Sequence, residues 1–450
     1  MPDINLILMT VIFSFTILFM LWRPFGINET IPTSIGALLV LLLGIVPFTD
    51  VLNIFDIVSG AALTILSTIM MSIVLESIGF FRLIALNIVN RSNGSGVKLY
   101  IYILLLCFMM TMFFNNDGSI LITTPIIIHI VSLLKLKPKQ QIPYLLSGAL
   151  IATAASAPIA VSNISNLIAL EIVGLSLNNY IQMMFIPSMI AILVLAYLLY
   201  HYFKKDIPKK TRDISLIWKT QSLKYKYNHP LETSKPDEDV DWWLFKICIV
   251  IVVLTRASFF ALTPFGIPLE AVGLIGAALL IIIRWYRTKV GVIDIFKKTP
   301  WHILLFAFNM YVLVYGLKNV GLNQYIVESL GGYIVDQPFN ASLIMGVLLT
   351  VMSNLFNNLP AVMIGTLSIT EMGLDPHTLQ VAYLANVLGS DIGALLTPVG
   401  TLATLIWMYI LKSHSIHLSW GKYLKVTILI IPIALIIGLL SLYLWVEWIF

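Results

Sequence analysis

The chain has 450 residues, of which 59% are hydrophobic and only 11% are charged, and its formal net charge is +5. Soluble domains carry about 25% charged residues, so this chain could not cover a water-facing surface. Its basic residues lie in short loops instead of on one face, which excludes a nucleic-acid-binding protein. We therefore expect an all-α polytopic membrane protein.

Apolar runs, many of them near the roughly 20 residues that cross a hydrocarbon core, follow one another along the chain. The first run has no basic segment before it and no small-residue cleavage site, so we expect a retained span instead of a signal peptide. In chain order the runs cover residues 4–22, 33–49, 58–79, 99–114, 119–134, 142–170, 181–203, 243–262, 267–285, 301–319, 340–355, 360–372, 377–411 and 426–447.

Two pairs of short runs are separated by polar turn sequences, which cannot face lipid. Residues 115–118 (Asn-Asn-Asp-Gly) form the first and residues 357–360 (Asn-Asn-Leu-Pro) the second. We expect each to be the buried tip of a re-entrant hairpin. Turn-forming residues also interrupt the runs 142–170 and 377–411. The sequence thus predicts about ten transmembrane helices, two re-entrant hairpins and two broken helices.

The positive-inside rule orients this arrangement. With the N-terminus outside, 25 of the 27 Lys and Arg residues fall on the cytoplasmic side, and only Arg256 and Lys318 lie towards the outside. We expect both termini outside a bacterial inner membrane and the polar segment 204–242 inside. Attraction to anionic lipid is the simplest role for its basic cluster.

The two halves of the chain resemble each other. Residues 24–27 (Pro-Phe-Gly-Ile) recur as residues 264–267, and the Asn pairs of the two tips recur at nearly the same offset. Because the halves enter the membrane from opposite sides, the repeat is inverted, which is typical of transporters that work by alternating access. We predict a first transmembrane repeat with a cytoplasmic-side hairpin (1–203), a cytoplasmic linker (204–242) and a second, inverted repeat with an outer-side hairpin (243–450).

The two tips and the two helix breaks should converge near the membrane midplane, where unwound backbone and half-helix ends bind solutes and ions. Packing of membrane helices against each other is the competing interpretation for any single Asn, Ser or Thr. The side chains expected to bind substrate are Asn115, Asn116, Ser162, Asn163, Asn166, Asn357, Asn358, Thr397 and Thr401.

Asp117, at the first tip, and Asp391, in the second broken helix, are acids within these breaks. A charge at the bilayer centre costs about 2.5–3.5 kcal/mol, which a carboxylate avoids by binding a proton or a cation. We expect both acids to couple transport to an ion; the alternative is an acid that caps a half-helix in a wet cavity. No Lys or Arg lies in the breaks, which favours a small neutral polyhydroxyl solute, or an anion held by amide dipoles alone, over a multiply charged anion.

Several sequence blocks are specific enough to compare with known families. They are residues 114–119 with 124–125, 156–166, 300–301 with 310–319, 357–360, 383–391 and 397–407. In these blocks, and nearly from end to end, the chain resembles the arsenite/antimonite efflux permeases of the ion-transporter superfamily. The family's first-tip Asp falls on Asp117 and its fourth-break acid on Asp391, whereas Thr153 stands in place of an Asp and Leu395 in place of a Lys.

The resemblance implies export of the neutral hydroxide form of arsenite or antimonite in exchange for protons, with no cofactor and no resident metal. The expected partners are the inorganic solute, protons and the lipid bilayer. A soluble arsenical-pump ATPase and a second copy of the chain, as a homodimer, are further candidates. A sodium/proton antiporter or a carrier of a small organic anion is the alternative within the same fold. Without a His/Glu metal motif or a Gly-framed nucleophile, we do not expect an enzyme.

Overall fold

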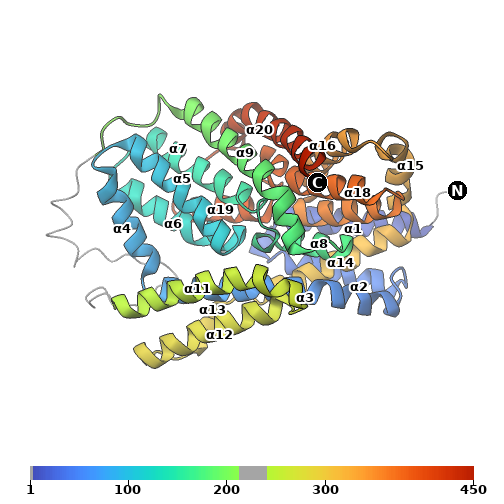
Figure 1. Cartoon of the computed structure of the whole chain (residues 1–450), viewed down its shortest axis with the longest axis horizontal. Helices are drawn as coiled ribbons and strands as arrows, with labels where there is room; N and C mark the ends of the chain where they lie inside the picture. Colours follow the sequence, from blue (N-terminus) through green and yellow to red (C-terminus); the bar gives the residue numbers. More distant parts are fainter. Residues whose placement is uncertain (1–3, 212–240) are drawn as a thin grey trace.

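A computed structural model describes residues 4–211 and 241–450, so most of the predicted linker 204–242 lies outside the described residues. The described residues fold into helices joined by short turns, without a β-strand among them (Figure 1). In this part of the chain, eleven helices are long and apolar enough to cross a membrane. The predicted all-α polytopic class is therefore confirmed.

Within residues 4–203, the first half contains nine α-helices and two short 3₁₀ turns. Its elements are α1 (Ile4–Trp22), η1 (Pro24–Gly26), α2 (Thr30–Leu42), α3 (Phe48–Ser77), α4 (Phe80–Ser92), α5 (Gly96–Phe113), α6 (Asn116–Leu133), α7 (Pro138–Ala154), η2 (Ala160–Ser162), α8 (Ile164–Val173) and α9 (Leu177–Phe203).

The second half has a similar order of elements, with one additional short helix, α13. Its elements are α11 (Trp242–Leu262), η3 (Thr263–Phe265), α12 (Leu269–Thr288), α13 (Ile293–Lys298), α14 (His302–Asn319), α15 (Leu322–Ile334), α16 (Pro338–Phe356), α17 (Asn358–Glu371), α18 (Pro376–Asp391), η4 (Gly393–Leu396), α19 (Leu402–Ser413) and α20 (Trp420–Ile449).

The four predicted interruptions are all helix boundaries. Helices α5 and α6 meet at Phe114 and Asn115, and α16 and α17 meet at Asn357. The broken helices are α7–η2–α8 and α18–η4–α19. At three of these points the next helix is capped by a side chain. Asn115, Asn163 and Thr401 each accept a hydrogen bond from a backbone N–H in the first turn of the helix that follows.

Two short helices, α4 and α15, were not expected from the apolar runs. Each begins directly after a glycine with a left-handed backbone, Gly79 (φ 79°) or Gly321 (φ 86°). Such a φ favours glycine and turns the chain sharply at the end of the preceding helix. Neither helix carries a long apolar stretch, and this is why hydropathy alone did not predict them.

Helices of the first half pack against helices of the second half, so the two halves are not separate units. Helix α2 packs on α14, and α12 on α3, as Figure 1 shows for the second pair. The second helix of each hairpin packs on the broken helix of the other half: α6 packs on α19, and α17 packs on α8. These contacts place the first hairpin beside the second broken helix and the second hairpin beside the first broken helix.

Candidate functional site

Asp391, the last residue of α18, is completely buried and lies against the broken helix of the first half. Its carboxylate accepts hydrogen bonds from Ser156 Oγ (2.9 Å), Asn163 Nδ2 (2.8 Å) and Asn166 Nδ2 (2.7 Å). The donors stand 225 to 235 residues away along the chain, in the break between α7 and α8 or in the first turn of α8. Asp391 therefore joins the two halves where both broken helices unwind.

Asn163 is oriented by two different contacts. Its Oδ1 accepts hydrogen bonds from the backbone N–H (3.1 Å) and the hydroxyl (2.7 Å) of Ser165. Asn163 thereby caps the N-terminus of α8. Because the oxygen is used in this way, the amide nitrogen is the end that points at Asp391. The N-terminus of α8 thus fixes the orientation of the Asn163 amide, so that its nitrogen faces the Asp391 carboxylate.

The donors around Asp391 are neutral. Among the described residues, no Lys or Arg forms a hydrogen bond or an ion pair with this carboxylate. The hydrogen bonds offset part of the cost of burying the charge, and a bound proton or cation would remove the rest. The site can therefore take up or release a positive charge without breaking an ion pair.

The tip of the first hairpin is held by Asn115. Its Oδ1 accepts from the Gly118 N–H (2.6 Å), and its Nδ2 donates to Thr68 Oγ1 (3.0 Å) in α3. The neighbouring Asn116 accepts from the Asp117 N–H (2.8 Å). Asp117 itself is half-buried in the first turn of α6, where the positive end of the helix dipole stabilises an acid.

A further charged residue, Arg256, holds this tip. The Arg256 guanidinium, buried in α11, donates from Nε to the Phe113 carbonyl (2.5 Å) and from Nη2 to the Phe114 carbonyl. These carbonyls end α5, where a cation is favourable. Glu29, before α2, is paired with Arg23 (2.8 Å).

The tip of the second hairpin holds the second broken helix. Asn354 Oδ1 accepts from the Thr397 N–H (2.7 Å), its Nδ2 donates to the Gly393 carbonyl (2.9 Å), and Asn357 Nδ2 donates to the Val399 carbonyl (3.2 Å). Asn357 has φ 81° and ψ 156°, a conformation that favours glycine and costs about 1–3 kcal/mol for other residues. This tip is therefore strained, unlike the first.

Two tyrosine hydroxyls donate hydrogen bonds to the backbone of the two broken helices. Tyr180 in α9 donates to the Ala157 carbonyl (2.5 Å), and Tyr423 in α20 donates to the Leu395 carbonyl (3.0 Å). Each satisfies a carbonyl that the interrupted helix leaves free. At these two points protein groups satisfy the unwound backbone, as a membrane interior requires.

Several buried polar atoms at the breaks have no hydrogen-bond partner among the described residues. They are Ser162 Oγ, Asn166 Oδ1, Ser353 Oγ, Asn357 Oδ1 and Thr397 Oγ1. Leaving such a group unpaired costs about 1–3 kcal/mol, so a hydroxyl-bearing solute that pairs with them would bind favourably.

The predicted site residues fall into three structural groups. Asn163, Asn166 and Asp391 form one hydrogen-bonded cluster, whereas Asn115, Asn116 and Asp117 lie together at the first tip. The third group lies at the second tip and the break that follows α18: it contains Asn357, Asn358, Thr397 and Thr401, the N-cap of α19. Ser162 belongs to the first broken helix, directly before Asn163, the N-cap of α8.

The sequence analysis did not identify Thr68 or Arg256, and it did not select Ser156 as a binding residue although Ser156 lies in a predicted break. The structure buries Arg256 against the first tip (7% exposed). A charge well inside an apolar run is itself a signal of function, and Arg256 carries that signal.

Replacement of Gly400 by Ala should open the second break. An added Cβ would overlap the Ala394 carbonyl oxygen and crowd Asn354 Oδ1 at 2.9 Å. We expect Gly400→Ala to lower the free energy of unfolding by about 1–3 kcal/mol, measured as thermal unfolding in detergent. Gly421→Ala is the matched control, since a Cβ there meets nothing within 4 Å. Equal stability of the two variants would contradict the tight packing of this turn.

Comparisons with known proteins agree on one family. The chain matches the family model described as "Arsenical pump membrane protein" over residues 8–446. A relative in Bacillus subtilis (strain 168), also named for an arsenical pump, is 48% identical and covers 97% of this chain and 99% of its own. The Arsenical pump membrane protein of Escherichia coli (strain K12) is 32% identical, over 93% of this chain and 94% of its own.

A solved structure shares the fold. The Alcanivorax borkumensis YdaH transporter superimposes with a TM-score of 0.55 over 89% of this chain and 88% of its own, at 11% sequence identity. At that identity the likeness concerns the fold alone.

Proposed function

The chain belongs to the arsenical pump membrane protein family, which makes it an arsenical efflux transporter and not an enzyme, and we propose that it exchanges arsenite or antimonite for protons. We propose that it lies in the bacterial inner membrane with both termini outside and works by alternating access. The observation that supports this most is the buried Asp391 carboxylate, bound by neutral donors from the other half of the chain.

The chemistry of such a carboxylate suits an exchange. The neutral hydroxide of arsenite offers O–H donors, and a charged Asp391 accepts from one of them. The remaining hydroxyls of the solute can donate to Asn166 Oδ1 and form a hydrogen bond with Ser162 Oγ, both of which are otherwise unpaired among the described residues. A proton on Asp391 removes acceptor capacity and weakens the solute's binding. Proton and solute would therefore compete for one carboxylate, which is the condition for antiport.

Alternating access requires two related arrangements of the same parts. We propose that residues 1–203 and 243–450 are inverted repeats. Paired contacts support this: Gly36 in α2 lies against Thr16 of α1, and Gly276 in α12 lies against Thr255 of α11. Similar contacts at similar positions mean that each half could adopt the packing of the other at little cost.

Expression of the chain should lower arsenite accumulation in arsenite-sensitive cells. We expect several-fold less intracellular arsenic than in cells with an empty vector, with a smaller difference when the pH gradient is dissipated. Normal accumulation in cells shown to contain the protein in their membranes would refute the proposed substrate. An unaltered difference without the gradient would refute the proton coupling alone.

Sodium is the second candidate for the coupling ion. Small hard cations prefer oxygen ligands, and free oxygens of Asn166 and Ser162 belong to the same break that binds the Asp391 carboxylate. Arsenite flux measured in proteoliposomes distinguishes the two coupling ions. Arsenite flux that follows an imposed sodium gradient at constant pH would favour sodium, and flux that follows only the pH gradient would favour the proton.

A further inference from the structure

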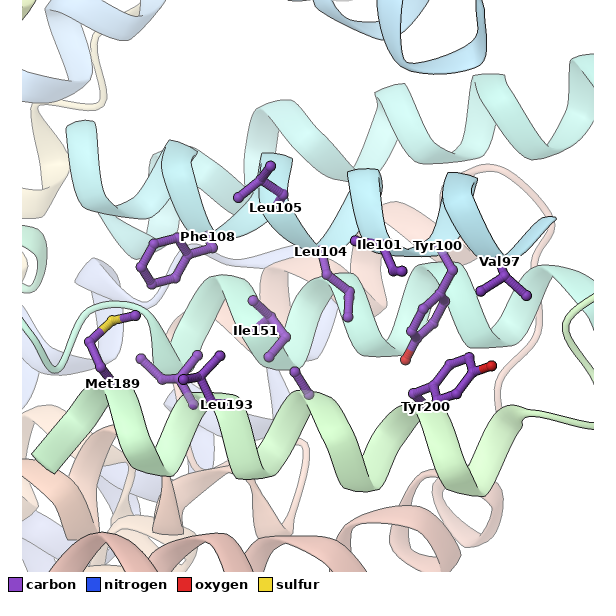
Figure 2. A pocket seen from close by; sticks show the side chains of 12 residues that line it. Val97, Tyr100, Ile101, Leu104, Leu105, Phe108, Ile151, Met189, Leu193 and Tyr200 are labelled. Carbon is purple, nitrogen blue, oxygen red and sulfur yellow. The ribbon is translucent and has the colours of Figure 1, made fainter. Parts of the chain in front are cut away.

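A groove of about 520 Å³ runs along the outer side of the first hairpin, between α5, α7 and α9. Figure 2 shows its side chains: Leu104 and Phe108 from α5 form one wall, Ile151 from α7 the floor, and Met189 and Leu193 from α9 the other wall. Its size and apolar lining match those of sites that bind small apolar ligands.

One end of this groove carries the polar groups. The Tyr100 and Tyr200 rings lie 6.1 Å apart there, while Met189 and Phe108 lie at the other end (Figure 2). The Tyr100 hydroxyl donates to Ser147 Oγ (2.8 Å), so it is already satisfied inside the protein. The groove is therefore closed by aromatic rings at one end and apolar along its length.

Exposed lysines follow groove-lining residues of α5 and α9 at the tyrosine end. Lys98 follows the groove residue Val97 at the start of α5, and Lys204 and Lys205 follow the last turn of α9, which contains Tyr200. The chain beyond α9 is tied to the start of α5, because the Thr211 N–H donates to the Gly94 carbonyl (2.8 Å). These contacts keep the two groups of lysines at the same end of the groove.

A second groove provides a comparison. It has a similar volume, about 460 Å³, and lies between α9 and α20, with Ile186, Leu440, Trp445 and Trp448 in its walls. No Lys or Arg occurs in residues 177–200 or 426–450, which contain these walls. Two apolar grooves of similar size thus differ in the charge beside them, and only the first is complementary to an anionic headgroup.

We propose that the groove between α5, α7 and α9 binds one anionic phospholipid, with an acyl chain along the groove and its phosphate at Lys98, Lys204 and Lys205. An acyl chain is the apolar ligand that a bilayer supplies at this surface, and lysines near the surface attract anionic headgroups. Since α5 is an arm of the first hairpin and α9 follows the broken helix, the lipid contacts two parts that hold the transport site.

Native mass spectrometry of the full-length protein, with phosphatidylglycerol or phosphatidylcholine added, tests this proposal without any transport assay. We expect one phosphatidylglycerol to be retained at least tenfold more strongly than phosphatidylcholine. The triple variant Lys98→Gln, Lys204→Gln, Lys205→Gln should bind phosphatidylglycerol on the order of 100-fold more weakly. Ala196→Trp, which fills the groove, should abolish retention while thermal unfolding stays unchanged.

Matched variants separate this site from general lipid contact. The triple variant Lys246→Gln, Lys297→Gln, Lys425→Gln removes the same charge elsewhere, and Ser441→Trp fills the second groove. Both should retain phosphatidylglycerol as the unmodified protein does. Equal retention of the two lipids, or equal losses in test and control variants, would overturn the proposal. So would conversion of a dimer to a monomer by Ala196→Trp, which would identify the groove as an interface between copies.

Discussion

Asp391→Asn should reduce arsenite flux driven by a pH gradient to the level of protein-free liposomes. The substitution removes the only group of its hydrogen-bonded cluster that can bind and release a proton. It also turns one acceptor into an amide that faces the donors of Asn163 or Asn166, and one such mismatch costs about 1–3 kcal/mol. Arsenite-stimulated proton flux in proteoliposomes measures the first effect, and thermal unfolding in detergent measures the second.

Asp375→Asn is the matched control for this variant. Asp375 caps the opposite end of the same helix, α18, by accepting from the His377 and Thr378 N–H groups (3.0 Å each). Asn caps helices as well as Asp does, so both flux and stability should be retained. Normal proton-coupled flux in the Asp391→Asn protein would remove Asp391 from the ion pathway and leave it a purely structural residue.

Arg256→Gln should release the first hairpin tip from α11. The change leaves the Phe113 and Phe114 carbonyls with a shorter, neutral donor, and it removes the cation that stabilises the C-terminal end of α5. Because hydrogen bonds from charged groups contribute about 1.5–3 kcal/mol each, we expect a loss of at least 2 kcal/mol in unfolding free energy. Arsenite flux should fall more than tenfold, since the tip also carries Asn115 and Asp117.

A comparison with Arg256→Lys separates charge from shape. Lysine keeps the cation but offers one ammonium instead of a planar fork, so it should recover part of the flux and part of the stability. Lys246→Gln, an exposed position in the same helix, should change neither quantity. A glutamine variant as stable and as active as the unmodified protein would show that Arg256 does not hold the tip.

Much of the fold could be predicted because the bilayer imposes simple rules on sequence. Apolar runs must match its thickness, and polar turns such as Asn115–Gly118 cannot face lipid, so runs and interruptions read directly as helices and breaks. The run 4–22 coincides with α1, and the interruptions coincide with helix ends at Asn115, Asn163, Asn357 and Thr401. Each of these features depends on a few neighbouring residues and on the solvent around them.

The chemistry of the site could be predicted in kind but not in arrangement. Composition limited the charged groups in the breaks to a short set, and Asp391 belonged to it. That its partners are Ser156, Asn163 and Asn166 depends on contacts across more than 200 residues, and no local pattern contains this information.

The sequence by itself thus determined that the chain is a polytopic helical membrane protein, where its helices break and which acids lie in the breaks, because the low charge content leaves few alternatives. Only the tertiary structure decided which breaks meet. The packing of helices between the halves brings Arg256 of the second half onto the first hairpin tip, a contact that its place in the apolar run 243–262 does not reveal. The physical reason is that a buried charge is stable only beside partners, and packing alone chooses them.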